Sequence, residues 1–344
     1  MGRGNRMPNR LLKMQEMILV ALVVMAIPTV IVLMLGWSSA VTLAMLAAMG
    51  GMFAAVGNRY RGLILLTVAN GVSTFLAVLV AGSPIAAGFL MLVLGVALGV
   101  VNKWGLSVWN FMFPVLAAAV IAQPPKIIND LIPNALMVGL TAMGCLLIPA
   151  LLVGLVLKHP MQKTIPIYAR KVNVLYTVNL GLVLGGAGYA AAAVHDELLG
   201  TWIALSVVAI LIHPYAGQIA SRALQRGAGT VVGFLVAIGV AASLLPDFLY
   251  YAAGLVFLEV AIFMKVDPKR QYWEYVLFLT PGVVLLSGTP SQVGSVGNDR
   301  LGATIVAMVA CLIVLGIERL IFWRSGLGTP EAQPAAPATV EPAK

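Results

Sequence analysis

Residues 201–243 read TWIALSVVAILIHPYAGQIASRALQRGAGTVVGFLVAIGVAAS, two apolar runs joined by a short basic turn that carries Arg222 and Arg226. Each run is long enough to cross a bilayer as a helix, which needs about 20 mostly apolar residues. The second run opens with Gly229 and Gly233, and glycines four residues apart on one helical face let a neighbouring helix approach closely. The stretch therefore predicts two membrane-spanning helices, the second with a packing face.

A similar stretch occurs earlier in the chain, where residues 37–83 read WSSAVTLAMLAAMGGMFAAVGNRYRGLILLTVANGVSTFLAVLVAGS. Matching features recur in the same order in the two halves of the sequence, at separations of 165 to 169 positions. They are Trp37 and Trp202, Arg61 and Arg226, the Asn-Asp pairs at 129–130 and 298–299, and the two cysteines of the chain, Cys145 and Cys311. This internal repeat indicates that the chain consists of two copies of one unit.

The composition excludes a water-soluble protein. Of the 344 residues, 61% are hydrophobic and only 10% are charged, and the mean hydropathy is +1.00. A soluble core cannot hide so many apolar runs. The net charge of +9 does not indicate a nucleic-acid partner, because the basic residues are scattered over short loops that form no binding face. We therefore predict an all-α polytopic membrane protein in a lipid bilayer.

Twelve apolar runs have the length of a membrane span. The first half, residues 17–157, holds spans at 17–35, 38–57, 62–81, 84–101, 106–122 and 132–157. The second half, residues 173–325, holds spans at 173–194, 199–219, 227–245, 247–264, 271–287 and 301–322. A basic segment (1–16) precedes them, a linker (158–172) joins the halves, and a Pro/Ala-rich tail (326–344) is expected to be disordered. Since six is an even number, the halves enter the membrane in the same orientation, as two parallel six-helix repeats.

Lysine and arginine are concentrated in alternate loops, which lie on one side of a twelve-span chain. The positive-inside rule assigns that side, and with it both termini, to the cytoplasm. The opposite side holds only Lys126 and Arg300 beside several acidic residues. The predicted location is therefore the cytoplasmic (inner) membrane.

Two short motifs resemble those of a known family. Residues 222–233 read RALQRGAGTVVG, and residues 298–307 read NDRLGATIVA. The first resembles the signature of the fusaric acid resistance and aromatic acid exporter family. The second is similar to that family's closing segment, with Ala307 where a glycine is common. The first half of the chain departs from the signature, since Ile64 and Leu65 replace its Gly-Thr pair.

The resemblance implies a secondary transporter that exports small organic acids, aromatic ones in particular, or related toxic compounds. It also implies coupling to protons and, as a partner, a periplasmic adaptor protein. The six-helix unit resembles that of plant anion channels that work as dimers, so a passive anion channel and a homo-oligomer are alternatives. A non-transporting membrane scaffold for a partner protein is another. No Walker, G-x-S-x-G or H-E-x-x-H motif occurs, and we expect neither an ATP-driven pump nor an enzyme.

Five polar residues mark the predicted substrate pathway between the halves. Arg61 and Arg226 occupy equivalent cytoplasmic ends of the third and ninth spans. They would attract an organic anion at the inner mouth, unless they are ordinary positive-inside residues. Asn70, Asn110 and Asn179 lie inside spans and would contact either the substrate or neighbouring helices.

Glu259 is the predicted proton-coupling residue. It lies well inside a predicted span, six residues before Lys265 and thus about 9 Å inside the cytoplasmic boundary. Charged groups at such depth are costly and usually face a bundle interior or a wet cavity. The alternative is a packing role, with a hydrogen-bond partner on a neighbouring helix.

Glycine-rich segments are assigned to helix packing. Gly181 and Gly185 lie within an apolar span and follow no strand, so they indicate a close helix contact rather than a dinucleotide site. The same role is predicted for Gly229 and Gly233. The histidines have no cysteine or acidic partners at ligand spacing, so we expect no metal and no other cofactor.

Overall fold

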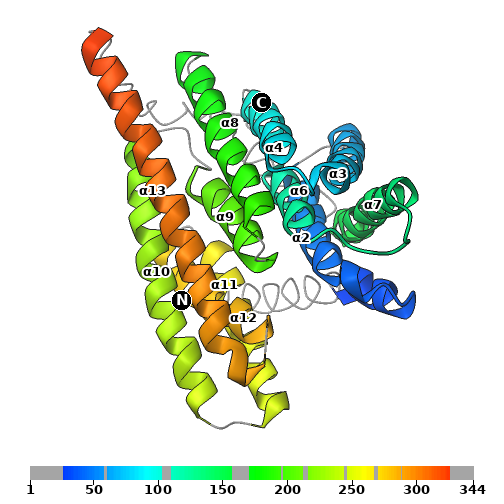
Figure 1. The fold of residues 1–344 in the computed structure, drawn as a ribbon. Helices are drawn as coiled ribbons and strands as arrows, with labels where there is room; N and C mark the ends of the chain where they lie inside the picture. The colour runs from blue at the N-terminus through cyan, green and yellow to red at the C-terminus, as the bar shows by residue number, and fades with distance from the viewer. Residues whose placement is uncertain are drawn as a thin grey trace, which may run out of the picture.

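A computed structural model of the chain describes residues 26–57, 60–102, 110–156, 170–194, 197–211, 216–243, 246–266, 270–287 and 289–325, which form helices and turns without a strand among them. Residues 26–34 are helical. The helices that follow are η1 (Ser38–Ala40), α2 (Val41–Gly57), α3 (Tyr60–Val80), α4 (Pro84–Val101), α6 (Met112–Ala122), α7 (Leu131–Val156), α8 (Arg170–Ala193), α9 (Glu197–Ile210), α10 (Ala216–Ala242), α11 (Asp247–Val266), α12 (Tyr272–Leu286), η3 (Pro290–Gln292) and α13 (Val293–Ser325) (Figure 1). The basic segment, most of the linker and the tail lie outside the described residues.

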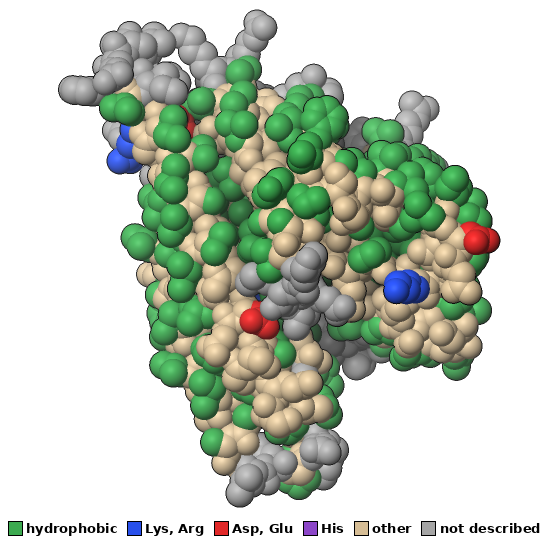
Figure 2. Space-filling model, viewed as in Figure 1, with side chains coloured by type: hydrophobic (Ala, Val, Ile, Leu, Met, Phe, Trp, Pro, Cys, Tyr) green, Lys and Arg blue, Asp and Glu red, His purple; other side chains and the backbone are tan. Residues whose placement is uncertain are grey.

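The lengths and surfaces of these helices are those of a membrane protein. Within the described residues, six helices are long and apolar enough to cross a bilayer, and shorter apolar helices accompany them. Large apolar side chains such as Leu65, Ile85 and Phe89 are 71%, 80% and 69% exposed. Figure 2 shows hydrophobic side chains over much of the visible face. An apolar surface of this extent needs contact with lipid. The chain is therefore a multi-pass membrane protein, and the total of twelve spans stays a prediction.

The helices of the two halves pack in corresponding pairs. In the first half, α7 lies against α2 and α3, and α6 lies against α3 and α4. In the second half, α13 lies against α9 and α10, and α12 lies against α10 and α11. When the helices are matched by their place in the predicted repeat, α2 corresponds to α9 and α7 to α13. Each of these four contacts then has an equivalent in the other half.

An extensive contact between the two halves runs along α4 and α8, which lie side by side in Figure 1. Glycines allow the two backbones to approach. A Cβ atom on Gly95 would lie 2.8 Å from the carbonyl oxygen of Leu180, and one on Gly181 would lie 2.8 Å from Cγ2 of Val96. Gly185, one turn beyond Gly181, faces α4 in the same way. We call this contact the α4–α8 seam.

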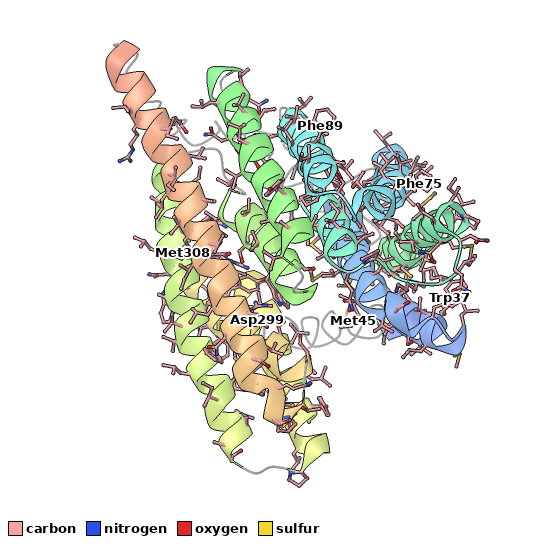
Figure 3. The ribbon with its side chains drawn as sticks, viewed as in Figure 1. Trp37, Met45, Phe75, Phe89, Asp299 and Met308 are labelled. Carbon is pink, nitrogen blue, oxygen red and sulfur yellow. The ribbon has the colours of Figure 1, made fainter. Side chains whose placement is uncertain are left out.

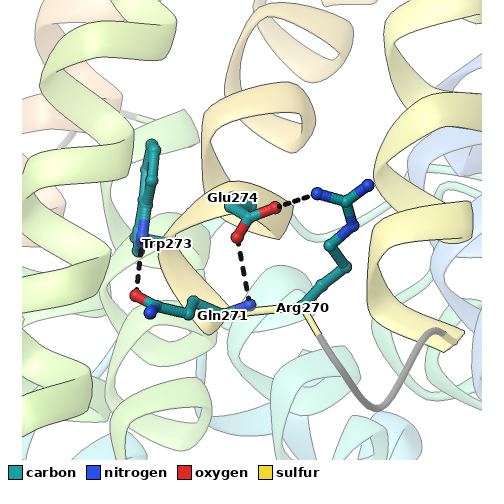
Figure 4. Close-up of polar contacts among 4 residues, drawn as sticks. All are labelled: Arg270, Gln271, Trp273 and Glu274. Carbon is teal, nitrogen blue, oxygen red and sulfur yellow. Dashed lines mark hydrogen bonds and ion pairs between the residues drawn. The ribbon is translucent and has the colours of Figure 1, made fainter.

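The first turn of α12 is fixed by hydrogen bonds among neighbouring residues (Figure 4). The backbone N–H of Gln271 donates to Oε1 of Glu274 at 3.3 Å, and Nη1 of Arg270 donates to Oε2 of the same carboxylate at 3.2 Å. Nε1 of Trp273 donates to Oε1 of Gln271 at 3.0 Å. A side chain that closes the first turn in this way satisfies backbone N–H groups that would otherwise lack partners. The start of α12, and with it Tyr272, is thereby held in place.

Helices α10 and α13 begin two or more turns before the predicted spans at 227 and 301. Because α10 begins at Ala216, Arg222 and Arg226 lie inside a helix, and the predicted basic turn at these residues is wrong. Because α13 begins at Val293, Arg300 also lies inside a helix and not in a loop. The first turns of α10 are rich in alanine, leucine, glutamine and arginine, which favour helix over turn.

Candidate functional site

Arg226 is the centre of a polar cluster inside the helical bundle. Its guanidinium donates from Nη1 to the hydroxyl oxygen of Tyr272 at 3.0 Å and from Nη2 to Oγ of Ser206 at 3.1 Å. The side chain is 3% exposed, and its Nε has no hydrogen-bond partner. Arg226 is ten residues beyond the start of α10, about 15 Å along the helix axis. It therefore ties α10 to α9 and α12 within a candidate membrane span.

A second arginine, Arg300 on α13, lies close to the first. Its guanidinium carbon is 4.5 Å from the ring centre of Trp202 on α9, a distance typical of a cation–π contact. The side chain is 3% exposed, its Nη1 is buried without a partner, and its charge interacts with that of Arg226. In Figure 3, the labels of Asp299 and Met308 mark the part of α13 that carries Arg300.

A third arginine, Arg222, lies one turn before Arg226 on α10. Its guanidinium carbon is 4.8 Å from the ring centre of Tyr272, so this tyrosine meets Arg222 with its ring and Arg226 with its hydroxyl. The ring of Tyr275 lies 5.9 Å from that of Tyr272, and its hydroxyl interacts electrostatically with Arg226 and Arg300. We refer to the following residues as the arginine cluster: Arg222, Arg226 and Arg300, with Trp202, Ser206, Tyr272 and Tyr275 around them.

Three cations in one cluster need a counter-charge. No acidic side chain that the structure describes forms an ion pair with them, and each guanidinium has a buried nitrogen without a hydrogen-bond partner. Charges inside a membrane are costly, and nearby like charges repel each other. The planar N–H forks of guanidinium groups match the geometry of carboxylates. The arginine cluster is therefore chemically suited to hold a small organic anion between α9, α10, α12 and α13.

In a comparison with protein families, residues 187–314 match the family described as fusaric acid resistance protein-like. This segment is therefore similar to that family. It contains every residue of the arginine cluster and both motifs that resemble the family. The family resemblance predicted from the sequence is therefore confirmed. No curated protein and no solved structure matched the chain.

Of the four predicted pathway residues whose side chains the structure describes, Arg226 belongs to the arginine cluster and the three asparagines do not. Asn70, on α3, is buried and donates to the carbonyl oxygen of Leu66 at 2.9 Å. Asn110 is buried just before α6, outside the segment that matches the family. Asn179, on α8, donates from Nδ2 to Oε2 of Glu318 at 2.7 Å. The three asparagines therefore lie outside the arginine cluster.

Two predicted functional side chains lie outside what the structure describes. Arg61 falls in the first turn of α3 and Glu259 falls within α11, but the positions of their side chains are not among the described ones. The pairing of Arg61 with Arg226 and the proton-coupling role of Glu259 therefore stay predictions.

The predicted packing glycines Gly229 and Gly233 lie between α10 and α12. A Cβ atom on Gly229 would be 2.8 Å from the carbonyl oxygen of Trp273, and one on Gly233 would be 2.7 Å from that of Leu277. This close approach brings Tyr272 within reach of Arg226. In the described part of the chain, no three His, Cys, Asp or Glu side chains come together as metal ligands would.

Sequence reasoning missed most of the cluster. Trp202, Tyr272 and Tyr275 lie near the ends of predicted spans, where aromatic side chains commonly form a belt at the membrane interface, and Arg300 lies in a predicted loop. A single sequence does not reveal which of these residues are neighbours in space. A usable signal was nevertheless present. Each of the two family-like motifs contains arginine, and the fold brings the motifs together.

Proposed function

We propose that this protein is a secondary transporter that exports small organic acids or related toxic compounds, aromatic acids in particular, across the cytoplasmic membrane. The observation that carries this proposal is the arginine cluster, which places buried cations with unused N–H groups inside candidate membrane spans. A carboxylate would satisfy these donors. The rings of Trp202, Tyr272 and Tyr275 offer apolar surface beside it for an aromatic substituent.

The proposed topology has twelve spans in two parallel six-helix repeats, with both termini in the cytoplasm. The matching helix contacts in the two halves support the repeat, and the positive-inside rule supports the orientation. In this orientation α10 and α12 begin at the cytoplasmic side. An anion from the cytoplasm would meet the partly buried Arg222 before it reaches Arg226 and Arg300, which are both 3% exposed.

We further propose that export is coupled to proton uptake, and that the protein transports rather than catalyses a reaction. Glu259 and Arg61 are the groups predicted from the sequence to take part in coupling and in anion attraction. A periplasmic adaptor would continue the path beyond the membrane. In transporters built from repeats, the substrate site near the membrane midplane opens to each side in turn.

The test of this proposal is anion binding by the full chain in lipid nanodiscs. Benzoate and benzenesulfonate should raise its unfolding free energy, by about 2.7 kcal/mol at one hundred times the dissociation constant. Neutral benzamide, which has a similar shape, should not. Arg226→Ala and Arg300→Ala should abolish the effect, whereas Lys126→Ala, which removes an exposed cation of the first half, should not. Equal stabilisation by benzamide, or unchanged binding by Arg226→Ala, would contradict the proposal.

Transport assays separate an exporter from a passive channel. In proteoliposomes, benzenesulfonate inside the vesicles should accelerate uptake of labelled benzenesulfonate from outside, because a carrier exchanges its substrate. A channel would instead carry a benzenesulfonate current without such acceleration. A scaffold would do neither, and the Arg226→Ala variant would then equal its parent.

A further inference from the structure

A second polar contact between membrane helices lies away from the arginine cluster. Oε2 of Glu318 on α13 accepts a hydrogen bond from Nδ2 of Asn179 on α8, at 2.7 Å. Asn179 is 8% exposed and Glu318 is partly buried. Both residues belong to candidate membrane spans, Asn173–Ala193 and Pro290–Leu320. An acidic side chain within a span is rare and usually functional.

The partner of this carboxylate suits both of its protonation states. An ionised carboxylate only accepts hydrogen bonds, and the amide N–H of Asn179 supplies one. A protonated carboxyl group donates, and after a flip of the amide its oxygen can accept that bond. A lysine or arginine partner would favour the ionised state alone. Asparagine can accompany the gain and the loss of a proton without leaving either group unpaired.

The charged and titratable side chains described around this contact are few. Arg319, the next residue on α13, is exposed and interacts electrostatically with Glu318. On the packed helices, Tyr176 lies one turn before Asn179 on α8, and Arg222 lies on α10 against Tyr272. The described side chains of α9 include no titratable group. The titratable side chains of α12, which are Tyr272, Glu274 and Tyr275, lie at the start of that helix beside the arginine cluster.

The same helix carries this contact and part of the arginine cluster. Arg300 and Glu318 are 18 residues apart in α13, which runs from Val293 to Ser325 without a proline. This separation corresponds to about 27 Å along the axis. A continuous helix moves largely as one body, so a displacement of α13 at Glu318 would also displace Arg300 relative to α9 and α10. The α4–α8 seam holds α8, the other partner of the contact, against the first half.

We propose that Glu318 is the proton-binding group that couples proton uptake to anion export, with Asn179 as its partner in both protonation states. This inference rests on the proposed transport function. Binding of one proton converts the carboxylate to a neutral acid and reverses its hydrogen bond to α8. Release of that proton to the cytoplasm restores the charge. α13 transmits each change to the arginine cluster, where the anion is bound or released.

A direct test follows the proton without transport. Infrared difference spectra of the full chain in nanodiscs, recorded over a pH titration, should contain a carboxylic acid C=O band that is absent in Glu318→Gln. The band should shift in Asn179→Leu, which removes the hydrogen bond. It should persist in Glu274→Gln, which alters an acid outside the contact. A titrating band that is unchanged in Glu318→Gln and in Asn179→Leu would overturn the proposal.

The coupling itself is tested with benzenesulfonate in proteoliposomes, because this anion stays ionised and does not cross lipid as a neutral acid. The membrane potential is clamped with potassium and valinomycin, and a pH gradient is imposed. The Glu318→Gln variant keeps the hydrogen bond from Asn179. Its uphill accumulation of benzenesulfonate should be at least tenfold lower than that of the parent, and its exchange of benzenesulfonate should be retained. Glu318→Asp, which can still titrate, should recover part of the accumulation. The inference would be overturned if Glu318→Gln still accumulated benzenesulfonate against its gradient, or if only Glu259→Gln lost this accumulation.

These experiments distinguish the inference from the proposed function. Absence of exchange in the parent protein contradicts transport, while the infrared titration still decides whether Glu318 binds a proton. Exchange without coupling in the parent contradicts proton-driven export and the role of Glu318 together. If Glu318→Gln loses exchange, Glu318→Asp serves as the control, because aspartate can still bind a proton. Equal loss of exchange in both variants would show that Glu318 is a structural contact and would overturn the inference.

Discussion

The two halves of the molecule use similar helix contacts but enclose different chemistry. On α3, polar side chains bond to their own helix: Oγ1 of Thr67 donates to the carbonyl oxygen of Leu63, and Oγ1 of Thr74 donates to that of Asn70, both at 2.8 Å. On α10, which corresponds to α3 in the predicted repeat, Arg226 bonds instead to two other helices. Hydroxyl groups satisfied within one helix leave little hydrogen-bonding capacity for a ligand, whereas the guanidinium groups retain unused donors.

The difference shows how a repeated scaffold can carry a site in one half only. Helix contacts depend on small residues and apolar faces, and both halves supply these. A site depends on a few long polar side chains, and the described part of the first half has no counterpart to Arg300 or Tyr272. Each prediction below pairs a residue of the second half with one of the first.

The largest expected difference is between Arg226 and Arg61. Arg226→Ala should weaken benzenesulfonate binding about 100-fold, equivalent to about 2.7 kcal/mol, because it removes a buried cation and its hydrogen bonds. Arg61→Ala should weaken binding less than about tenfold, because the cluster stays intact. Titration calorimetry of the nanodisc-embedded variants measures both. Arg226→Lys should recover part of the affinity, since it keeps the charge but loses the planar fork. Equal losses for both alanine variants would place the site across the two halves.

Close helix contacts should respond alike in the two halves. Gly233→Ala brings a Cβ atom to 2.7 Å from a backbone oxygen of α12, and Gly139→Ala brings one to 2.8 Å from a backbone oxygen of α3. Each should lower the free energy of unfolding by about 1–3 kcal/mol, the usual cost of overpacking. Reversible unfolding in detergent measures the change. Gly239→Ala and Gly144→Ala are matched controls, because nothing lies within 4 Å of the added atom. A large effect in one half alone would contradict a common scaffold.

A smaller difference is expected between two tryptophans. Trp202→Leu removes the ring that faces Arg300, so it should cost about 1 kcal/mol of anion affinity, within the range of cation–π contacts. Trp37→Leu, at the equivalent place in the repeat, should leave affinity unchanged. Binding of benzenesulfonate to each variant gives the comparison. Weaker binding in both would indicate that the first half contributes to the site.

The smallest effect concerns single hydroxyl groups. Ser206→Ala removes the acceptor for Nη2 of Arg226 and should reduce anion affinity by about 0.5–1.5 kcal/mol, the net contribution of one hydrogen bond. Thr74→Val, which removes a bond within α3, should change stability slightly and affinity not at all. Tighter binding by Ser206→Ala would show that Ser206 competes with the anion for the guanidinium.

The sequence predicted helices well where apolar runs have clear ends. The predicted span 84–101 coincides with α4, and the span 132–157 differs from α7 by one residue at each end. Prediction failed at the start of α10 and of α13, because arginine was taken to mark a loop. Burial of Arg226 and Arg300 depends on Ser206, Tyr272 and Trp202, which are distant in sequence. Such long-range compensation of a charge has no local signature, so the cluster could not be derived from one sequence.

The α4–α8 seam has a consequence for how the protein is made. Helix α4 leaves the ribosome well before α8, whose last residue lies 92 positions after the last residue of α4. At about 5–20 residues per second, this interval lasts roughly 5–20 s. During that time α8, which covers the glycine face of α4 in the folded chain, is not yet available. The first half is therefore made before the helix that covers α4. Because α8 precedes α9, α10, α12 and α13 in the chain, the seam can form before the arginine cluster assembles.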